Sequence, residues 1–179
     1  QVNVQELLAG ELLLPFNNHF INLTLVAADF LQLNDVVDAA SMYLCRELHP
    51  SNALGIFRFA EAHNCKQLAE SASAFINSHF PDIIENDEIL EISSQMFSRL
   101  ISSEMIRIES EYQVFQACMR WVKHEISNRK RFVFDILANV RLSLVPLRLI
   151  ETEIAQCRDM SLKIALRSIL KDLTSRRGQ

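Results

Sequence analysis

The scarcity of glycine limits this chain more than any other feature of its sequence. Only Gly10, Gly55 and Gly178 occur among 179 residues. Sheets joined by tight hairpins need residues that adopt positive φ, and phosphate-binding loops need glycine clusters. Because three separated glycines supply neither, the sequence predicts helices joined by short turns, and therefore an all-α fold.

The overall charge argues against two classes of partner. The formal net charge is −4, and the basic residues are scattered apart from Arg129–Arg131 and the pair near the C-terminus. A weakly acidic chain attracts neither nucleic acid nor an anionic membrane over long range. No apolar run is long enough to span a bilayer, and no secretory signal is visible. We expect neither nucleic acid nor membrane as a partner.

The cysteines do not form a metal or redox motif. They are widely spaced, and no two of them make a C-x-x-C pair: Cys45, Cys65, Cys118 and Cys157. Zinc sites and redox pairs need closely spaced ligands, so we expect reduced thiols, no metal and no cofactor. Reduced thiols fit a cytoplasmic location, with nuclear or cytoskeletal locations as alternatives.

Apolar residues recur at helical spacing over most of the chain. The period predicts one helix over 25–48, a second over 52–64 capped by Ser51, and a third that Pro81 ends. Asn64 is expected to terminate the second helix. Further helices are predicted from residue 85 onward, the clearest of them over 108–126. The large side chains expected in the core are Phe59, Phe75, Phe115 and Trp121.

No constellation in the sequence supports catalysis. His63 and Cys65 are two residues apart, so on a helix they point in different directions and do not make a nucleophile and base pair. Glu109 and Glu111 stand at a helix start, where the helix dipole favours acids. We therefore predict that the chain is not an enzyme.

Phe57 raises a separate question. It lies roughly 100° from Ile56 and roughly 200° from Phe59 around a helix, so the two phenylalanines do not share one narrow core stripe. Either this helix is buried on two sides, or Phe57 contacts another chain.

Four blocks of sequence resemble one known family. The stretch "LHPSNALGIFRFAEAHNC" (48–65) carries a long and specific motif, and "NVQELL", "LAESASAFINSHF" and "VFQACMRWVKHEISNRKRFVFDILANVRLSLV" agree with it. Together they are similar to Kelch-like proteins, at the end of the BTB domain and through the BACK domain. The resemblance covers residues 26 to about 147.

The resemblance implies a scaffold in a ubiquitin ligase. Kelch-like proteins are substrate adaptors of cullin-3 RING ligases: the BTB domain forms a homodimer and docks cullin-3, a helix pair called the 3-box completes the cullin groove, and a Kelch propeller holds the substrate protein. Some members instead organise the actin cytoskeleton without a cullin. The candidate residues for the cullin groove are Asn52, Ile56, Phe57, Arg58, Phe59 and His63.

The resemblance also implies domain bounds. Residues 1–48 would be the C-terminal remnant of a truncated BTB domain, and 49–173 a BACK helical-hairpin array with the 3-box at 51–80. Residues 174–179 would be a polar tail. The segment from about 10 to 25 interrupts the family pattern and carries Gly10 and Pro15, so we expect an insertion that the fold does not need.

Overall fold

The computed structural model describes residue 27 and residues 34–177, and this part of the chain is helical without strands. The all-α prediction is confirmed. The chain divides into two compact units, Gln1–Ile76 and Asn77–Gln179. The predicted insertion at residues 10–25, and most of the predicted BTB remnant, lie outside the described residues. The predicted domain bounds therefore stay predictions.

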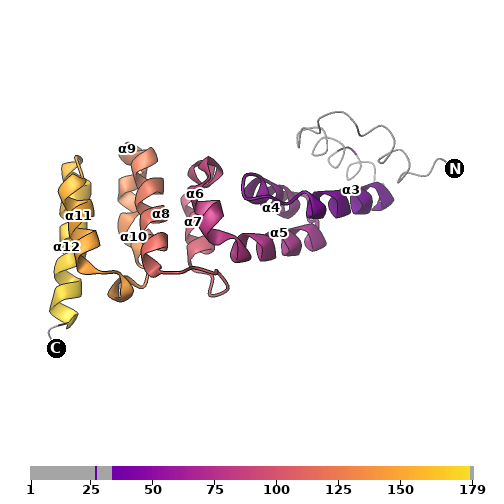
Figure 1. The fold of residues 1–179 in the computed structure, drawn as a ribbon. Coiled ribbons are helices and arrows are strands. Elements are labelled where there is room, and N and C mark those ends of the chain that lie inside the picture. Colours follow the sequence, from indigo (N-terminus) through magenta and orange to yellow (C-terminus); the bar gives the residue numbers. More distant parts are fainter. Residues whose placement is uncertain (1–26, 28–33, 178–179) are drawn as a thin grey trace. The chain divides into compact units, whose positions relative to one another are not determined.

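Three helices make up the described part of the first unit: α3 (Asn34–Arg46), α4 (Ala53–Ala62) and α5 (Lys66–Ser78), the last of which runs two residues past the boundary (Figure 1). Asn64 has a φ of 55°, a left-handed conformation that asparagine tolerates, and it separates α4 from α5 as predicted. A shared core, here called the first-unit core, joins the three helices. It consists of Ala40, Leu44, Ile56, Ala60, Leu68 and Ala72.

Two predicted helix boundaries in this region are wrong. Asn52, and not Ser51, is the N-cap residue of α4, because the Ser51 hydroxyl hydrogen-bonds to the His49 ring instead of an α4 amide. Pro81 does not end a helix but lies in the first turn of α6 (Phe80–Glu85). Proline suits that position because the first amides of a helix have no intrahelical acceptor.

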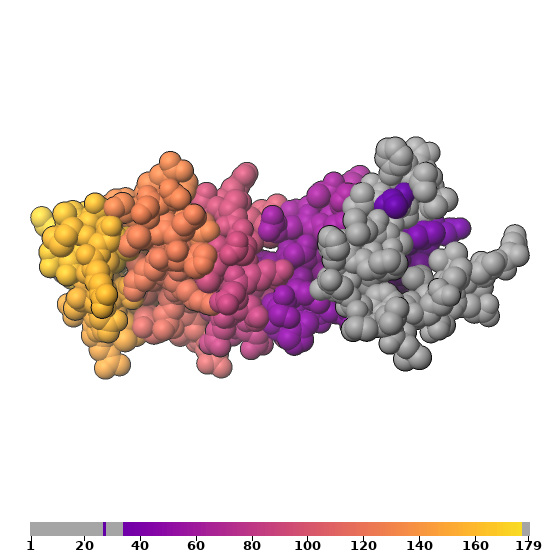
Figure 2. Space-filling model, turned by 90° about the horizontal axis from the view of Figure 1, so that it is seen from above, coloured from indigo at the N-terminus to yellow at the C-terminus, as the bar shows by residue number. Residues whose placement is uncertain are grey.

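The second unit continues from α6 as a series of short helices. Figures 1 and 2 show α6 and α7, then α8 to α10, then α11 and α12, side by side in chain order. The elements after α6 are η1 (Asp87–Glu91), α7 (Ser94–Ile101), α8 (Glu111–His124), α9 (Ile126–Arg129), η2 (Lys130–Phe132), α10 (Val133–Leu137), η3 (Leu142–Leu144), α11 (Leu147–Gln156) and α12 (Met160–Arg177).

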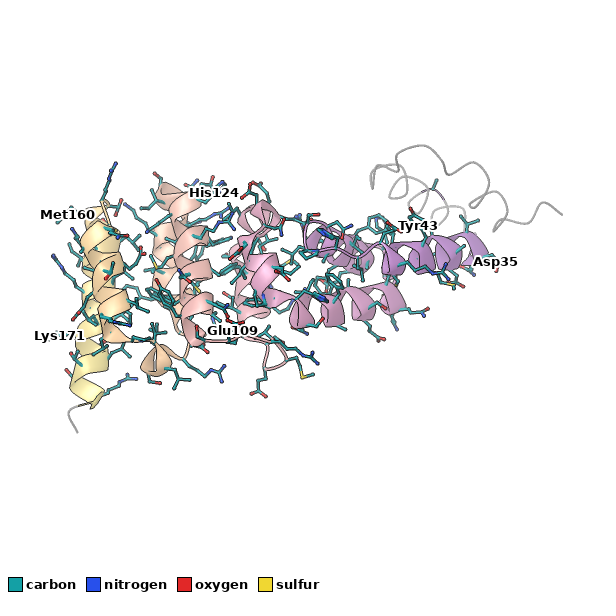
Figure 3. All side chains as sticks on the ribbon, viewed as in Figure 1. Asp35, Tyr43, Glu109, His124, Met160 and Lys171 are labelled. Atoms are coloured by element: carbon teal, nitrogen blue, oxygen red, sulfur yellow. The ribbon has the colours of Figure 1, made fainter. Side chains whose placement is uncertain are left out.

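Helix α8 carries the core of the second unit. Figure 3 places Glu109 just before its N-terminal end and His124 at its C-terminal end. Its start is fixed by the Gln113 side chain, whose Oε1 accepts the backbone N–H of Glu109 at 2.9 Å. The Trp121 ring stacks on Phe97 with centroids 5.1 Å apart, and its Nε1–H donates to the Ile92 carbonyl at 3.1 Å.

The four large side chains expected in the core divide into two pairs. Trp121 and Phe115 are buried, as predicted. Phe59 and Phe75 are only partly buried, so the prediction is wrong for them. Each stands one residue before a core position, Ala60 or Ile76, and is therefore rotated by about 100° to the edge of the packed face.

Candidate functional site

The turn that leads into α4 is held by Asn52. Its Nδ2 donates to the Glu47 carbonyl at 2.8 Å, and its Oδ1 accepts the His49 backbone N–H at 2.8 Å. Both ends of the amide are therefore used to close the connection between α3 and α4. In the structure, Asn52 acts on its own chain and sets where α4 begins.

Ile56 packs α4 against the first-unit core. Its side chain is 4% exposed and belongs to the first-unit core, and Leu54 on the same helix is fully buried. A buried side chain offers no surface to a partner. The structure thus places Ile56, one of the six groove candidates, beneath the candidate surface.

Phe57 and Phe59 both follow Ile56 in the sequence and flank it around α4, and both are partly buried against the first-unit core. The helix is therefore packed over a wider face than a single stripe. This arrangement agrees with the first alternative raised by the sequence, a helix covered on two sides. Both rings also keep some exposed surface.

Arg58 differs from its neighbours because its side chain is exposed. It stands between the two partly buried rings along the chain. A cation beside aromatic surface is a combination that is common at protein–protein contacts. We name the exposed parts of Phe57, Arg58 and Phe59 the α4 surface.

His63 and Cys65 each make a local contact at the C-terminal end of α4. The His63 ring lies against Phe59, with ring centroids 4.4 Å apart, and the Cys65 Sγ donates to the His63 backbone carbonyl at 3.7 Å. Both of these contacts are structural, and a spacing of two residues on one helix end does not suit a nucleophile and base pair. In the second unit, burial raises the pKa of the Cys118 thiol far above its ordinary value, which keeps it protonated and unreactive.

The described residues offer no metal site: no three histidine, cysteine or acidic side chains among them are grouped so that they could hold an ion. Within the same residues, no helix is long and apolar enough to cross a membrane.

The sequence did not reveal a hollow between α6 and α8 in the second unit, lined by Pro81, Glu85 and Gln113 among others. Pro81 was interpreted as a terminator, so α6 was not recognised as a helix. Proline followed by the acid Asp82 is a signal typical of a helix start, and it could have identified this wall.

These features define an all-α array in which a helix pair presents a mixed aromatic and basic surface and carries no recognisable catalytic group among the described residues. A sequence model of one family, described as BACK: BTB And C-terminal Kelch, matches residues 53–155. The match covers more than half of the chain, and the chain therefore belongs to the BACK domain family of Kelch-like proteins.

Individual relatives agree with this assignment. The chain is 38% identical over 126 residues to Kelch-like protein 4 of Homo sapiens and 38% identical over 136 residues to Kelch-like protein 25 of Xenopus laevis. It is 36% identical over 126 residues to Kelch-like protein 3 of Homo sapiens. The matches cover 70%, 76% and 70% of this chain, but only 18%, 23% and 22% of the relatives, so the chain corresponds to about a fifth of their length.

Proposed function

We propose that this chain is a non-catalytic interaction scaffold from a substrate adaptor of a cullin-3 RING ubiquitin ligase, acting in the cytoplasm. Helices α4 and α5 form the 3-box and contribute part of the cullin groove. In the complete adaptor, a BTB domain forms the homodimer and the main cullin contact, and a Kelch propeller binds the substrate protein.

The α4 surface is the observation that carries this proposal. Family membership supports an adaptor role, and the motif that identifies the family runs through α4. On that helix, Arg58 is exposed between two rings that are only partly buried. Arginine and aromatic side chains supply most of the binding energy at typical protein interfaces. Asn52 and Ile56 hold the helix in place, so their part in the groove is to position the α4 surface.

Binding to cullin-3 tests the proposal directly. We would place a complete BTB domain from a Kelch-like relative ahead of residue 26 and measure binding to the N-terminal region of cullin-3 by calorimetry. Arg58→Glu should weaken binding by about 1 kcal/mol or more, because it reverses a charge at the interface without removing core atoms. Phe57→Ala should weaken binding by a similar amount, and it should also lower the melting temperature because Phe57 packs on the first-unit core.

Arg148→Glu is the matched control. Arg148 is exposed on α11 in the second unit, and its replacement makes the same change of charge. Unchanged cullin-3 affinity in the Arg58→Glu protein would refute the assignment of the α4 surface. A BTB fusion that does not bind cullin-3 at all would favour the alternative function, an actin-binding cytoskeletal role without a cullin, which sedimentation with actin filaments would test.

A further inference from the structure

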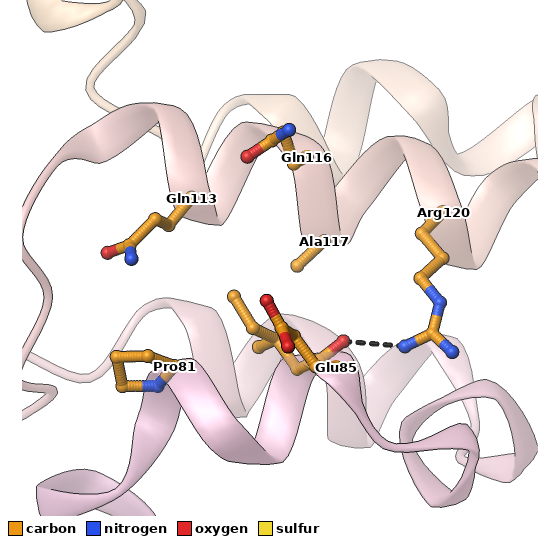
Figure 4. A pocket seen from close by; sticks show the side chains of 7 residues that line it. Pro81, Glu85, Gln113, Gln116, Ala117 and Arg120 are labelled. Carbon is orange, nitrogen blue, oxygen red and sulfur yellow. Dashed lines mark hydrogen bonds between the residues drawn. The ribbon is translucent and has the colours of Figure 1, made fainter.

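A hollow of about 480 Å³ lies between α6 and α8, entirely within the second unit. Its volume falls in the range of binding sites for small ligands or a few peptide residues. The apolar part of its lining comes from Pro81 and Ile84 on α6 and Ala117 on α8. Figure 4 shows Pro81 and Glu85 of α6 facing the α8 side chains across this space.

Arg120 fixes one end of the hollow. Its Nη1 donates to the carbonyls of Ile84 at 2.7 Å and Asn86 at 3.1 Å, and its Nη2 pairs with Asp87 at 2.5 Å (Figure 4 shows the bond to Ile84). These bonds tie α8 to the C-terminal end of α6. The hollow is therefore held open by the fold itself, and the charge of Arg120 is already offset by Asp87.

Gln113 lies at the opposite end of the hollow, and its side-chain amide can still donate hydrogen bonds. Its Oε1 accepts the backbone N–H groups of Glu109 and Ser110, at 2.9 and 3.5 Å. Its Nε2 amide, in contrast, remains able to donate to a peptide carbonyl in the hollow. Gln116 is exposed, and no hydrogen bond of its side chain occurs in the described part of the chain. Two amides thus line the hollow from α8.

The charged residues in and around the hollow determine which partner fits. The Glu85 carboxylate lines the hollow and has no ion pair among the described residues. Residues 80–91, which form α6 and η1, contain no lysine or arginine. Their acidic residues are Asp82, Glu85, Asp87, Glu88 and Glu91. A cationic side chain entering here would meet the Glu85 carboxylate, because the one basic side chain of the lining, Arg120, is already paired with Asp87.

We propose that the hollow between α6 and α8 binds an extended basic segment of a partner protein. The Gln113 and Gln116 amides hydrogen-bond its backbone, Glu85 pairs with an arginine or lysine, and a small apolar residue packs on Pro81, Ile84 and Ala117. This site lies outside α4, and the inference does not depend on the proposed cullin contact.

Nuclear magnetic resonance of the 179-residue chain tests the inference with three blocked peptides, Ala-Arg-Ala-Arg-Ala, Ala-Gln-Ala-Gln-Ala and Ala-Glu-Ala-Glu-Ala. The arginine peptide should shift the side-chain amide signals of Gln113 and Gln116, and the other two should not. Glu85→Lys should lower the affinity for the arginine peptide by roughly fivefold or more. Glu151→Lys, the same change on an exposed α11 residue, should leave its affinity unchanged.

A steric variant separates the hollow from general charge attraction. Gln116→Trp keeps the charge of the protein and places a large ring over the hollow, so it should also abolish the amide shift at Gln113. Equal losses in Glu85→Lys and Glu151→Lys would show non-specific attraction and overturn the inference. Stronger binding of the glutamate peptide, or full binding in Gln116→Trp, would overturn it as well.

Discussion

Arg129 joins separate segments of the second unit through a single guanidinium group. Its Nη2 donates to the Leu90 carbonyl of η1 at 2.7 Å, and its Nη1 donates to the Trp121 carbonyl of α8 at 3.1 Å. The guanidinium carbon also lies 4.2 Å from the centre of the Trp121 ring. Because only 12% of the side chain is exposed, these contacts are screened little by water.

Arg129→Ala should therefore lower the free energy of unfolding by about 2 kcal/mol or more, since it leaves two carbonyls without their charged donor and removes a cation–π contact. Arg131→Ala is the control, because Arg131 also lies over an aromatic ring, Phe132 at 4.7 Å, but is exposed. Arg131→Ala should lower the free energy of unfolding by less than about 1 kcal/mol. Urea unfolding measures both, and equal losses would contradict the special role of Arg129.

At the scale of the helices, the sequence predicted which segments are helical better than it predicted where each helix begins and ends. Asn64 was located correctly because a residue that tolerates positive φ ends a helix through local backbone chemistry. Pro81 was misassigned because proline is compatible both with the end of one helix and with the start of the next.

The candidate surface was predicted less completely than the fold. The family motif pointed to α4, but periodicity could not separate Ile56, which is buried, from Phe57 and Phe59, which are partly buried. That difference depends on which neighbouring helix covers each face, and this is tertiary information. The hollow between α6 and α8 was not predicted for the same reason, since residues more than 25 positions apart form its walls.

The contacts of Asp159 at the start of α12 should make the stability of the fold depend on pH. Asp159 precedes this helix, and its Oδ1 accepts the Leu162 backbone N–H at 2.9 Å while its Oδ2 pairs with Lys130 at 2.9 Å. The Leu162 N–H, together with Lys130, lowers the pKa of Asp159 below its ordinary value. The pKa of Asp159 is therefore lower in the folded chain than in the unfolded chain, where it is about 3.9. The ionised carboxylate stabilises the fold at pH values above this unfolded pKa, and the stabilisation is lost as the pH falls through the folded pKa.

Asp159→Asn should therefore reduce stability at neutral pH, and the difference from the unmodified chain should shrink in acid. Urea unfolding at a series of pH values measures the difference. Asp172→Asn is the control, because Asp172 is exposed within α12 and has no comparable contact to an amide or a lysine among the described residues. If the loss of stability in Asp159→Asn is the same at every pH, the charge of the Asp159 carboxylate is not what stabilises the fold.

At the scale of the whole chain, the proposed adaptor role predicts weak binding by the chain alone. If α4 and α5 supply only part of the cullin groove, their contacts do not offset the loss of translational and rotational freedom on association. The 179-residue chain should bind cullin-3 more than about tenfold more weakly, about 1.4 kcal/mol, than the fusion with a complete BTB domain. Calorimetry compares them, and equal affinities would show that the BTB domain is not the main contact.

The segment at residues 10–25 gives a second prediction at this scale. Its sequence has neither a helical nor an alternating period, and Gly10 and Pro15 are poor helix residues. It is also rich in large apolar residues, which promote association when no surface of the same molecule covers them. These are Leu12, Leu13, Leu14, Phe16 and Phe20.

Deleting residues 10–25 should keep or raise the melting temperature and should improve solubility, because the family pattern continues on both sides of the segment. Circular dichroism during heating and sedimentation velocity measure the two effects. Replacing the five large apolar residues with serine, at unchanged length, is the matched variant: it should improve solubility equally if exposed apolar surface causes association. A cooperative loss of folding in both variants would mean that the segment packs into the domain, and the insertion hypothesis would then be wrong.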